Sequence, residues 1–169
     1  MALLWEGHKR FGHHSWEQNL KESIHIAKKG FIPSQRFLNS IKLAKKIGIN
    51  HSPEFKLIYL PNNDLPSPTK PFKNHDLSKT LKSLAKGGLN EFYQGEIARN
   101  LISDLQKKQK DSHHHQIISA NDLTKYEVIE RSPICRKYKA WRVCSFPPPS
   151  GGGIAILQAL GIYEELSKV

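Results

Sequence analysis

The stretch that most restricts the fold begins at Phe146 and reads Phe-Pro-Pro-Pro-Ser-Gly-Gly-Gly-Ile-Ala-Ile-Leu-Gln-Ala-Leu. Consecutive prolines hold the backbone extended, because each ring fixes φ and removes an N–H donor. Ser150 and the three glycines after it are then placed to begin a helix. The apolar run that follows predicts that this helix reaches about Leu166.

The glycines of this stretch do not have the spacing of phosphate or nucleophile loops. A Walker loop needs a lysine and a hydroxyl residue after its last glycine, and here Ile154 follows Gly153. A dinucleotide fingerprint needs separated glycines, and a nucleophile elbow needs a glycine before its serine, whereas prolines precede Ser150. What remains is a helix start whose bare backbone N–H groups permit close approach of another chain segment or a small anion.

Upstream of this stretch the chain predicts a series of amphipathic helices. Ser15 and Gln18 have the spacing of a capping box that begins a helix, and Gly30 ends that helix. A new helix then starts after a proline, with Ser34 in its first turn. The proline-rich stretch 61–72 predicts an extended connection that packs over a surface, since apolar residues interrupt it.

The middle of the chain continues the helical pattern. Asp76 is predicted to cap the next helix, which ends at Gly87-Gly88, where one glycine takes the left-handed conformation. Apolar residues at helical spacing over 96–105 predict another amphipathic helix. Ser119 begins a short helix that ends by residue 126.

Strand patterns occur late in the chain. Residues 127–130 alternate as a half-buried strand, and residues 136–140 and 141–146 are predicted to form a tight antiparallel pair. Cys135 and Cys144 lie on either side of the turn between these strands, so a disulfide is geometrically possible, but we expect two free, half-buried thiols.

The fold class that these elements predict is α+β. The helical part covers about residues 2–110, and the short strands and terminal helix cover about 117–166.

The balance of charge raises the question of a nucleic-acid partner. The formal net charge is +11, which is typical of proteins that bind polyanions. The lysines are scattered along predicted helices, however, and zinc-finger spacing, basic-zipper heptads and an aromatic-rich single-strand signature are missing from the sequence. A nucleic-acid partner is therefore not favoured. A basic helical module that binds nucleic acid or an acidic partner stays the alternative function, and a steep fall of binding with salt would distinguish it.

Catalytic and metal-binding patterns are also missing. The histidines have no serine, cysteine or acid at an informative spacing, and His113–His115 have no second ligand group, so we expect a solvated polar loop there. We therefore expect no catalytic residue, metal or cofactor. No apolar run approaches the ~20 residues of a membrane span. No apolar signal core follows Met1, because charged residues follow within a few positions.

Four strings occur in an order that identifies a family. They are Leu84-Ala-Lys-Gly-Gly-Leu-Asn-Glu-Phe-Tyr-Gln-Gly-Glu-Ile-Ala98, Ile118-Ser-Ala-Asn-Asp-Leu-Thr-Lys-Tyr126, Arg136-Lys-Tyr138 and Pro147-Pro-Pro-Ser-Gly-Gly-Gly153. Together they resemble the γ-glutamyltransferase family, also called γ-glutamyltranspeptidase or glutathione hydrolase. Trp16-Glu-Gln18 and Ala27-Lys-Lys-Gly-Phe31 resemble the helical part of that family's large subunit, so the resemblance covers nearly the whole chain.

The resemblance implies an N-terminal-nucleophile hydrolase fold, a layered αββα sandwich made from two subunits cut from one precursor. A threonine at the start of the small subunit uses its own amine as base, attacks a γ-glutamyl amide such as that of glutathione, and passes the acyl group to water or an amine. Backbone N–H groups stabilise the oxyanion. Complete members are typically periplasmic, secreted or membrane-anchored, and the localisation of this chain stays undetermined.

The catalytic parts of the family do not map onto this chain. The threonine nucleophile lies well beyond the triple-proline string, and the carboxylate-binding arginine lies upstream of the matching region. Thr69, Thr80 and Thr124 stand in other contexts. The resemblance therefore implies a fragment of the large subunit, inactive alone, that needs a small subunit or the rest of the precursor. A structural remnant that associates with a full-length enzyme is a further alternative.

The substrate-binding candidates are Ser150, Gly151 and Gly152. Many family members carry a second serine where this chain has Gly151, so the chain departs from the family pattern at this position.

Overall fold

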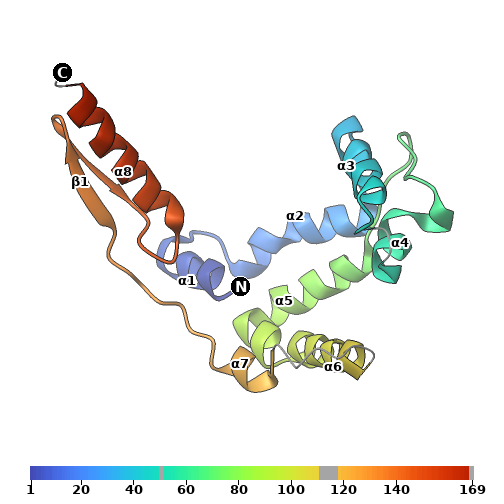
Figure 1. Cartoon of the computed structure of the whole chain (residues 1–169). Coiled ribbons are helices and arrows are strands. Elements are labelled where there is room, and N and C mark those ends of the chain that lie inside the picture. The colour runs from blue at the N-terminus through green and yellow to red at the C-terminus, as the bar shows by residue number, and fades with distance from the viewer. Residues whose placement is uncertain (50–51, 111–117, 168–169) are drawn as a thin grey trace. The chain divides into compact units, whose positions relative to one another are not determined.

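The computed structural model describes residues 1–49, 52–110 and 118–167, which form two units, Met1–Glu127 and Val128–Val169 (Figure 1). Each unit is compact in itself. The first contains α1 (Ala2–Phe11), α2 (Trp16–Lys29), α3 (Gln35–Lys46), α4 (Pro53–Tyr59), the 3-10 turn η2 (Pro61–Asn63), α5 (His75–Tyr93), α6 (Glu96–Lys110) and α7 (Ala120–Thr124). The second contains β1 (Ile134–Tyr138), β2 (Trp141–Ser145) and α8 (Gly151–Leu166).

Helices α2 and α5 lie side by side and form the centre of the first unit (Figure 1). The Trp16 indole Nε1 donates a hydrogen bond to the Leu84 carbonyl at 3.1 Å. Elsewhere along the same helix pair, the hydroxyl of the buried Ser78 donates to the Ile24 carbonyl at 3.3 Å. These two hydrogen bonds join side chain to backbone across the helix pair, so they fix the register of α2 on α5.

Replacement of Trp16 by phenylalanine is expected to lower the free energy of unfolding of the first unit by about 1 kcal/mol, because it removes one hydrogen bond and keeps an aromatic ring. Chemical denaturation followed by far-ultraviolet circular dichroism measures the change. Trp141→Phe is the matched control, since that ring is 72% exposed. Equal stability of the two variants would show that the Trp16 hydrogen bond contributes nothing.

The predicted capping box at the start of α2 is confirmed. The Ser15 N–H donates to Gln18 Oε1 at 2.8 Å, and the Gln18 N–H donates to Ser15 Oγ at 3.2 Å. Ser34 serves as the N-cap of α3 instead of lying in its first turn, because its hydroxyl accepts the Phe37 N–H at 3.2 Å. Short polar side chains therefore set both helix starts.

The predicted cap of α5 is wrong by two residues. Asn74 is the N-cap, and its Oδ1 accepts the Leu77 N–H at 2.9 Å. Asp76 lies in the first turn, where its carboxylate favours the positive end of the helix dipole and pairs with Lys79 Nζ at 2.9 Å.

Helix α5 is interrupted at Gly87-Gly88, as predicted. It bends at Gly88, with φ 58° and ψ −144°, and continues to Tyr93. The Trp5 ring from α1 lies directly against Gly88, so a Cβ there would be 2.8 Å from Trp5 Cη2. Glycine suits this position for two reasons. It adopts a positive φ readily, and it has no Cβ to clash with the Trp5 ring.

The connection 61–72 packs against the first unit, as predicted. Phe72 and Phe31 exchange two backbone hydrogen bonds, of 2.9 and 3.1 Å. Their rings meet the Phe37 ring, with centroids 5.2 to 5.8 Å apart, and Leu60 at the start of the connection is 3% exposed. The aromatic contacts hold a segment that has few hydrogen bonds of its own.

The short helix α7 carries the one clear electrostatic perturbation in the described part of the chain. Ser119 and Asp122 form a capping box, with the Asp122 carboxylate accepting both the hydroxyl and the N–H of Ser119. The side-chain hydrogen bond, followed by the backbone one, lowers the pKa of Asp122. Its capping contribution is therefore present above the ordinary pKa of an aspartate and is lost as the pH falls through the lowered value.

Ser119→Ala is expected to raise the pKa of Asp122 toward its ordinary value, because the largest cause of the shift is the Ser119 hydroxyl. A carboxyl NMR titration of the full chain measures this pKa. Thr124→Ala is the control, since the Thr124 hydroxyl donates to the Ala120 carbonyl in the same helix and leaves Asp122 untouched. An unchanged titration in the Ser119 variant would contradict this cause.

In the second unit β1 and β2 form an antiparallel hairpin, and α8 packs on the hairpin (Figure 1). Tyr138 pairs with Trp141, so the turn contains Lys139, with φ 51°, and one further residue. The predicted strand at 127–130 is wrong, because this segment has no regular secondary structure and joins the two units. A strand needs a partner for its backbone groups, and the described residues supply none here.

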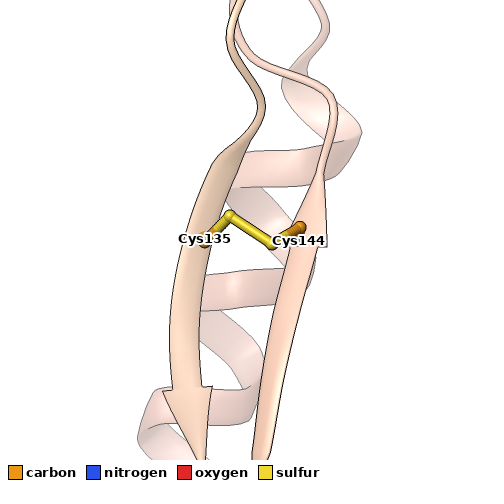
Figure 2. The surroundings of a disulfide bond; sticks show 2 residues. All are labelled: Cys135 and Cys144. Carbon is orange, nitrogen blue, oxygen red and sulfur yellow. A yellow bond between two sulfur atoms is a disulfide. The ribbon is translucent and has the colours of Figure 1, made fainter.

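The expected free thiols are corrected by the structure, which contains a disulfide between Cys135 and Cys144 (Figure 2). The turn places these two residues directly opposite each other, with Cα atoms 4.1 Å apart. That is close to the roughly 4.5 Å between non-hydrogen-bonded partners on antiparallel strands. In Figure 2 the disulfide lies in front of the hairpin and α8 lies behind it, so the bond occupies the face turned away from the helix.

Candidate functional site

The predicted helix start at Ser150 is present. Ser150 is the N-cap of α8, with extended backbone (φ −73°, ψ 118°), and its N–H donates to the Pro147 carbonyl at 3.2 Å. The Ser150 side chain makes no capping hydrogen bond. The Ser150 side chain therefore leaves the first N–H groups of α8 without a side-chain cap.

The three glycines after Ser150 have different surroundings. A Cβ at Gly151 would have no atom within 4 Å, and a Cβ at Gly152 would have only Ser150 Oγ at 3.9 Å. Gly153, in contrast, is buried, and a Cβ there would lie 2.0 Å from the Phe146 carbonyl oxygen. Close packing by a chain segment therefore explains Gly153, while Gly151 and Gly152 present open backbone.

Sequence reasoning missed the contact that joins the hairpin to α8. The Arg136 guanidinium lies against Gly161, where a Cβ would be 2.6 Å from Arg136 Cζ. Arg136 Nη2 is 3.9 Å from Glu164 Oε2, and Glu164 Oε1 accepts the Lys139 N–H at 3.1 Å. A glycine inside an apolar helix was the signal, since it often marks a close approach.

The threonines and histidines do not form a nucleophilic site among the described residues. The Thr80 and Thr124 hydroxyls donate to carbonyls four residues earlier, at 3.1 and 2.9 Å, and Thr69 Oγ1 is 3.2 Å from Ser67 Oγ. The described ranges hold no group of three side chains suited to a metal ion. His113–His115 lie outside the described residues.

A hollow lies on the first unit, between α2 and α5. It is a groove of about 560 Å³. Its lining residues come from both helices and are Ser15, Glu17, Gln18, Lys21, Ile24, Lys82, Ala85 and Lys86. No helix in the part of the chain that the structure describes is long and apolar enough to cross a membrane.

Comparison with known proteins gives the family. The model of the gamma-glutamyltranspeptidase family matches residues 1–169. The chain belongs to the gamma-glutamyltranspeptidase family. The glutathione hydrolase proenzyme of Pseudomonas aeruginosa is 32% identical over 161 residues, which are 95% of this chain and 27% of that protein. The glutathione hydrolase proenzyme of Escherichia coli (strain K12) is 30% identical over 145 residues, which are 86% of this chain and 24% of that protein.

The crystal structure of Helicobacter pylori gamma-glutamyltranspeptidase superposes with a TM-score of 0.82 at 28% identity, covering 95% of this chain and 44% of that one. This likeness confirms the predicted fold class, a mostly helical segment of the N-terminal-nucleophile hydrolase αββα fold. The chain spans about a quarter of the length of the curated relatives that it matches.

Proposed function

We propose that this chain is a segment of the large subunit of a γ-glutamyltransferase, an enzyme that cleaves γ-glutamyl amides such as glutathione and transfers the γ-glutamyl group to water, amino acids or peptides. The observation that carries the proposal is the family match, which extends over residues 1–169. The names of the relatives support it, since those proteins are glutathione hydrolase proenzymes.

The isolated chain does not cleave or transfer γ-glutamyl groups. Acyl transfer in this family needs a threonine with a free amine as its own base, and the hydroxyls of Thr80 and Thr124 are instead hydrogen-bonded inside helices. Ser150 does not replace that threonine, because its hydroxyl has no hydrogen bond to a base in the described ranges. The nucleophile comes from the small subunit or from the rest of the precursor.

The surface of α8 supports an assembled enzyme. This helix has only two charged residues among its 16, and apolar side chains remain exposed along it: Ile154 38%, Ile156 53%, Ile162 62%, Tyr163 59% and Leu166 70%. A helix that is apolar on all sides is normally buried. The small subunit or the remaining precursor covers α8, and Ser150, Gly151 and Gly152 at its start are the candidate substrate contacts.

The test is release of p-nitroaniline from γ-glutamyl-p-nitroanilide. The chain is assayed alone and after co-expression with the Escherichia coli relative from which the matching segment has been deleted. We expect no release by the chain alone and release by the co-expressed pair. Co-purification of the two chains on an affinity tag distinguishes an inactive complex from the absence of a complex.

Three outcomes separate the parts of the proposal. Release by the chain alone would overturn its inactivity, because an unidentified nucleophile would have to be present. Co-purification without release would support the structural role but place the catalytic defect in this segment. Neither co-purification nor release would contradict the proposal that the chain is a working segment of such an enzyme.

A further inference from the structure

We propose that the groove between α2 and α5 is a docking site for an acidic amphipathic helix of a partner protein. Lys21 lines the groove from α2, and Lys82 and Lys86 line it from α5. Glu17 is the acidic residue in the lining. The groove itself therefore carries an excess of positive charge.

These three lysines have no acidic partner among the residues that the structure describes. The described residues contain no ion pair that involves Lys21, Lys82 or Lys86. Lys79, one turn before Lys82 on the same helix, differs because it pairs with Asp76 at 2.9 Å. Uncompensated charges gathered in a hollow attract a ligand of opposite sign and fix its orientation.

The groove is held in shape before any partner arrives. The Trp16–Leu84 and Ser78–Ile24 hydrogen bonds cross from one helix to the other, and they involve residues of the groove or its neighbours. Its lining also includes Ile24 and Ala85, which provide apolar contact. A preformed groove loses little freedom on binding, which favours affinity.

The spacing of the lysines fits a helix. Lys82 and Lys86 are one turn apart, or about 6 Å along the axis. Carboxylates four residues apart on a partner helix match that separation. The apolar stripe of such a helix would contact Ile24 and Ala85, while the aliphatic stems of the lysines cover its edges.

The lining fits nucleic acid less well. Glu17 repels phosphate, and the lining includes no aromatic ring on which a base could stack. An acidic helix avoids both difficulties, because its apolar stripe needs no stacking partner and its carboxylates can be placed away from Glu17.

The experiment uses the full chain and a fluorescent synthetic peptide of ~18 residues, about five helical turns. The peptide carries a leucine stripe edged by glutamates four residues apart, and a scrambled peptide has the same composition. Fluorescence anisotropy measures the affinity. We expect the double variant Lys82→Glu/Lys86→Glu to weaken binding by at least about tenfold, since it reverses the charge of one wall.

The matched control is Lys42→Glu/Lys46→Glu on α3, which changes net charge equally, at the same spacing and away from the groove. This control should bind nearly as the unchanged chain does. Equal weakening by both double variants, or equal affinity for the scrambled peptide, would overturn the proposal in favour of general charge attraction. Displacement of the peptide by a single-stranded oligonucleotide that depends on the same lysines would overturn it in favour of nucleic acid.

Discussion

Gly153→Ala is expected to destabilise the packing of α8 on the hairpin by about 1–3 kcal/mol, the usual cost of forcing extra volume into a packed site. The added Cβ would lie 2.0 Å from the Phe146 carbonyl oxygen, so either the start of the helix or the segment before it must shift. The higher helix propensity of alanine offsets at most about 1 kcal/mol of this cost.

Hydrogen exchange of the full chain, followed by mass spectrometry, measures the effect. Peptides from 134–166 should exchange faster in the variant, while peptides from α2 should not change, since α2 belongs to the other unit. Gly151→Ala is the matched control, because nothing lies within 4 Å of its added Cβ. That control should be neutral or slightly stabilising. If exchange in both variants is as slow as in the unchanged chain, the segment before α8 shifts to accommodate the added Cβ without loss of stability.

We expect the same substitution to have different effects at Gly151 and Gly153, and the sequence pattern did not distinguish these glycines. The pattern allowed close packing or an open anion-binding turn. In the structure Gly153 packs against Phe146, while Gly151 and Gly152 remain open. The sequence alone could not divide the three glycines, because the division depends on where the backbone of Phe146 passes.

Local signals were the most reliable guide to the fold. The Ser15–Gln18 capping box, the start of α7 at Ser119 and the end of α8 at Leu166 all follow from residues within a few positions of each other. Such features need no knowledge of the tertiary structure, since a capping hydrogen bond closes within one turn.

The predictions that were wrong or incomplete concern features that depend on residues distant in the sequence or on a missing pairing partner. Gly88 interrupts α5 as predicted, but the Trp5 ring that packs against it comes from α1 and was not foreseen. The segment 127–130 alternates like a strand, yet no strand pairs with it in the described part of the chain. The disulfide was missed because the predicted strand bounds did not fix the register that the tight turn at Lys139 sets.

Loss of this disulfide is expected to have a comparable effect on the second unit. The bond closes a loop with a sequence separation of 9 residues. A loop of this size restricts the unfolded chain enough to contribute about 2–3 kcal/mol in the chain-entropy description. Cys135→Ser/Cys144→Ser should therefore speed hydrogen exchange across β1, β2 and α8. Thiol titration of the unreduced, denatured chain should find no free thiol, because both cysteines of the sequence are paired.

A reductant provides the control for this prediction. It should speed exchange over 134–166 in the unchanged chain and have no effect in the double variant, which has no sulfur bond to break. The Arg136–Glu164 contact and the pairing of Tyr138 with Trp141 remain after reduction, so the hairpin should loosen without losing its register. If the reductant leaves exchange unchanged, the turn and the contact with α8 hold the hairpin without help from the disulfide. If thiols titrate before reduction, the two cysteines are not bonded in solution.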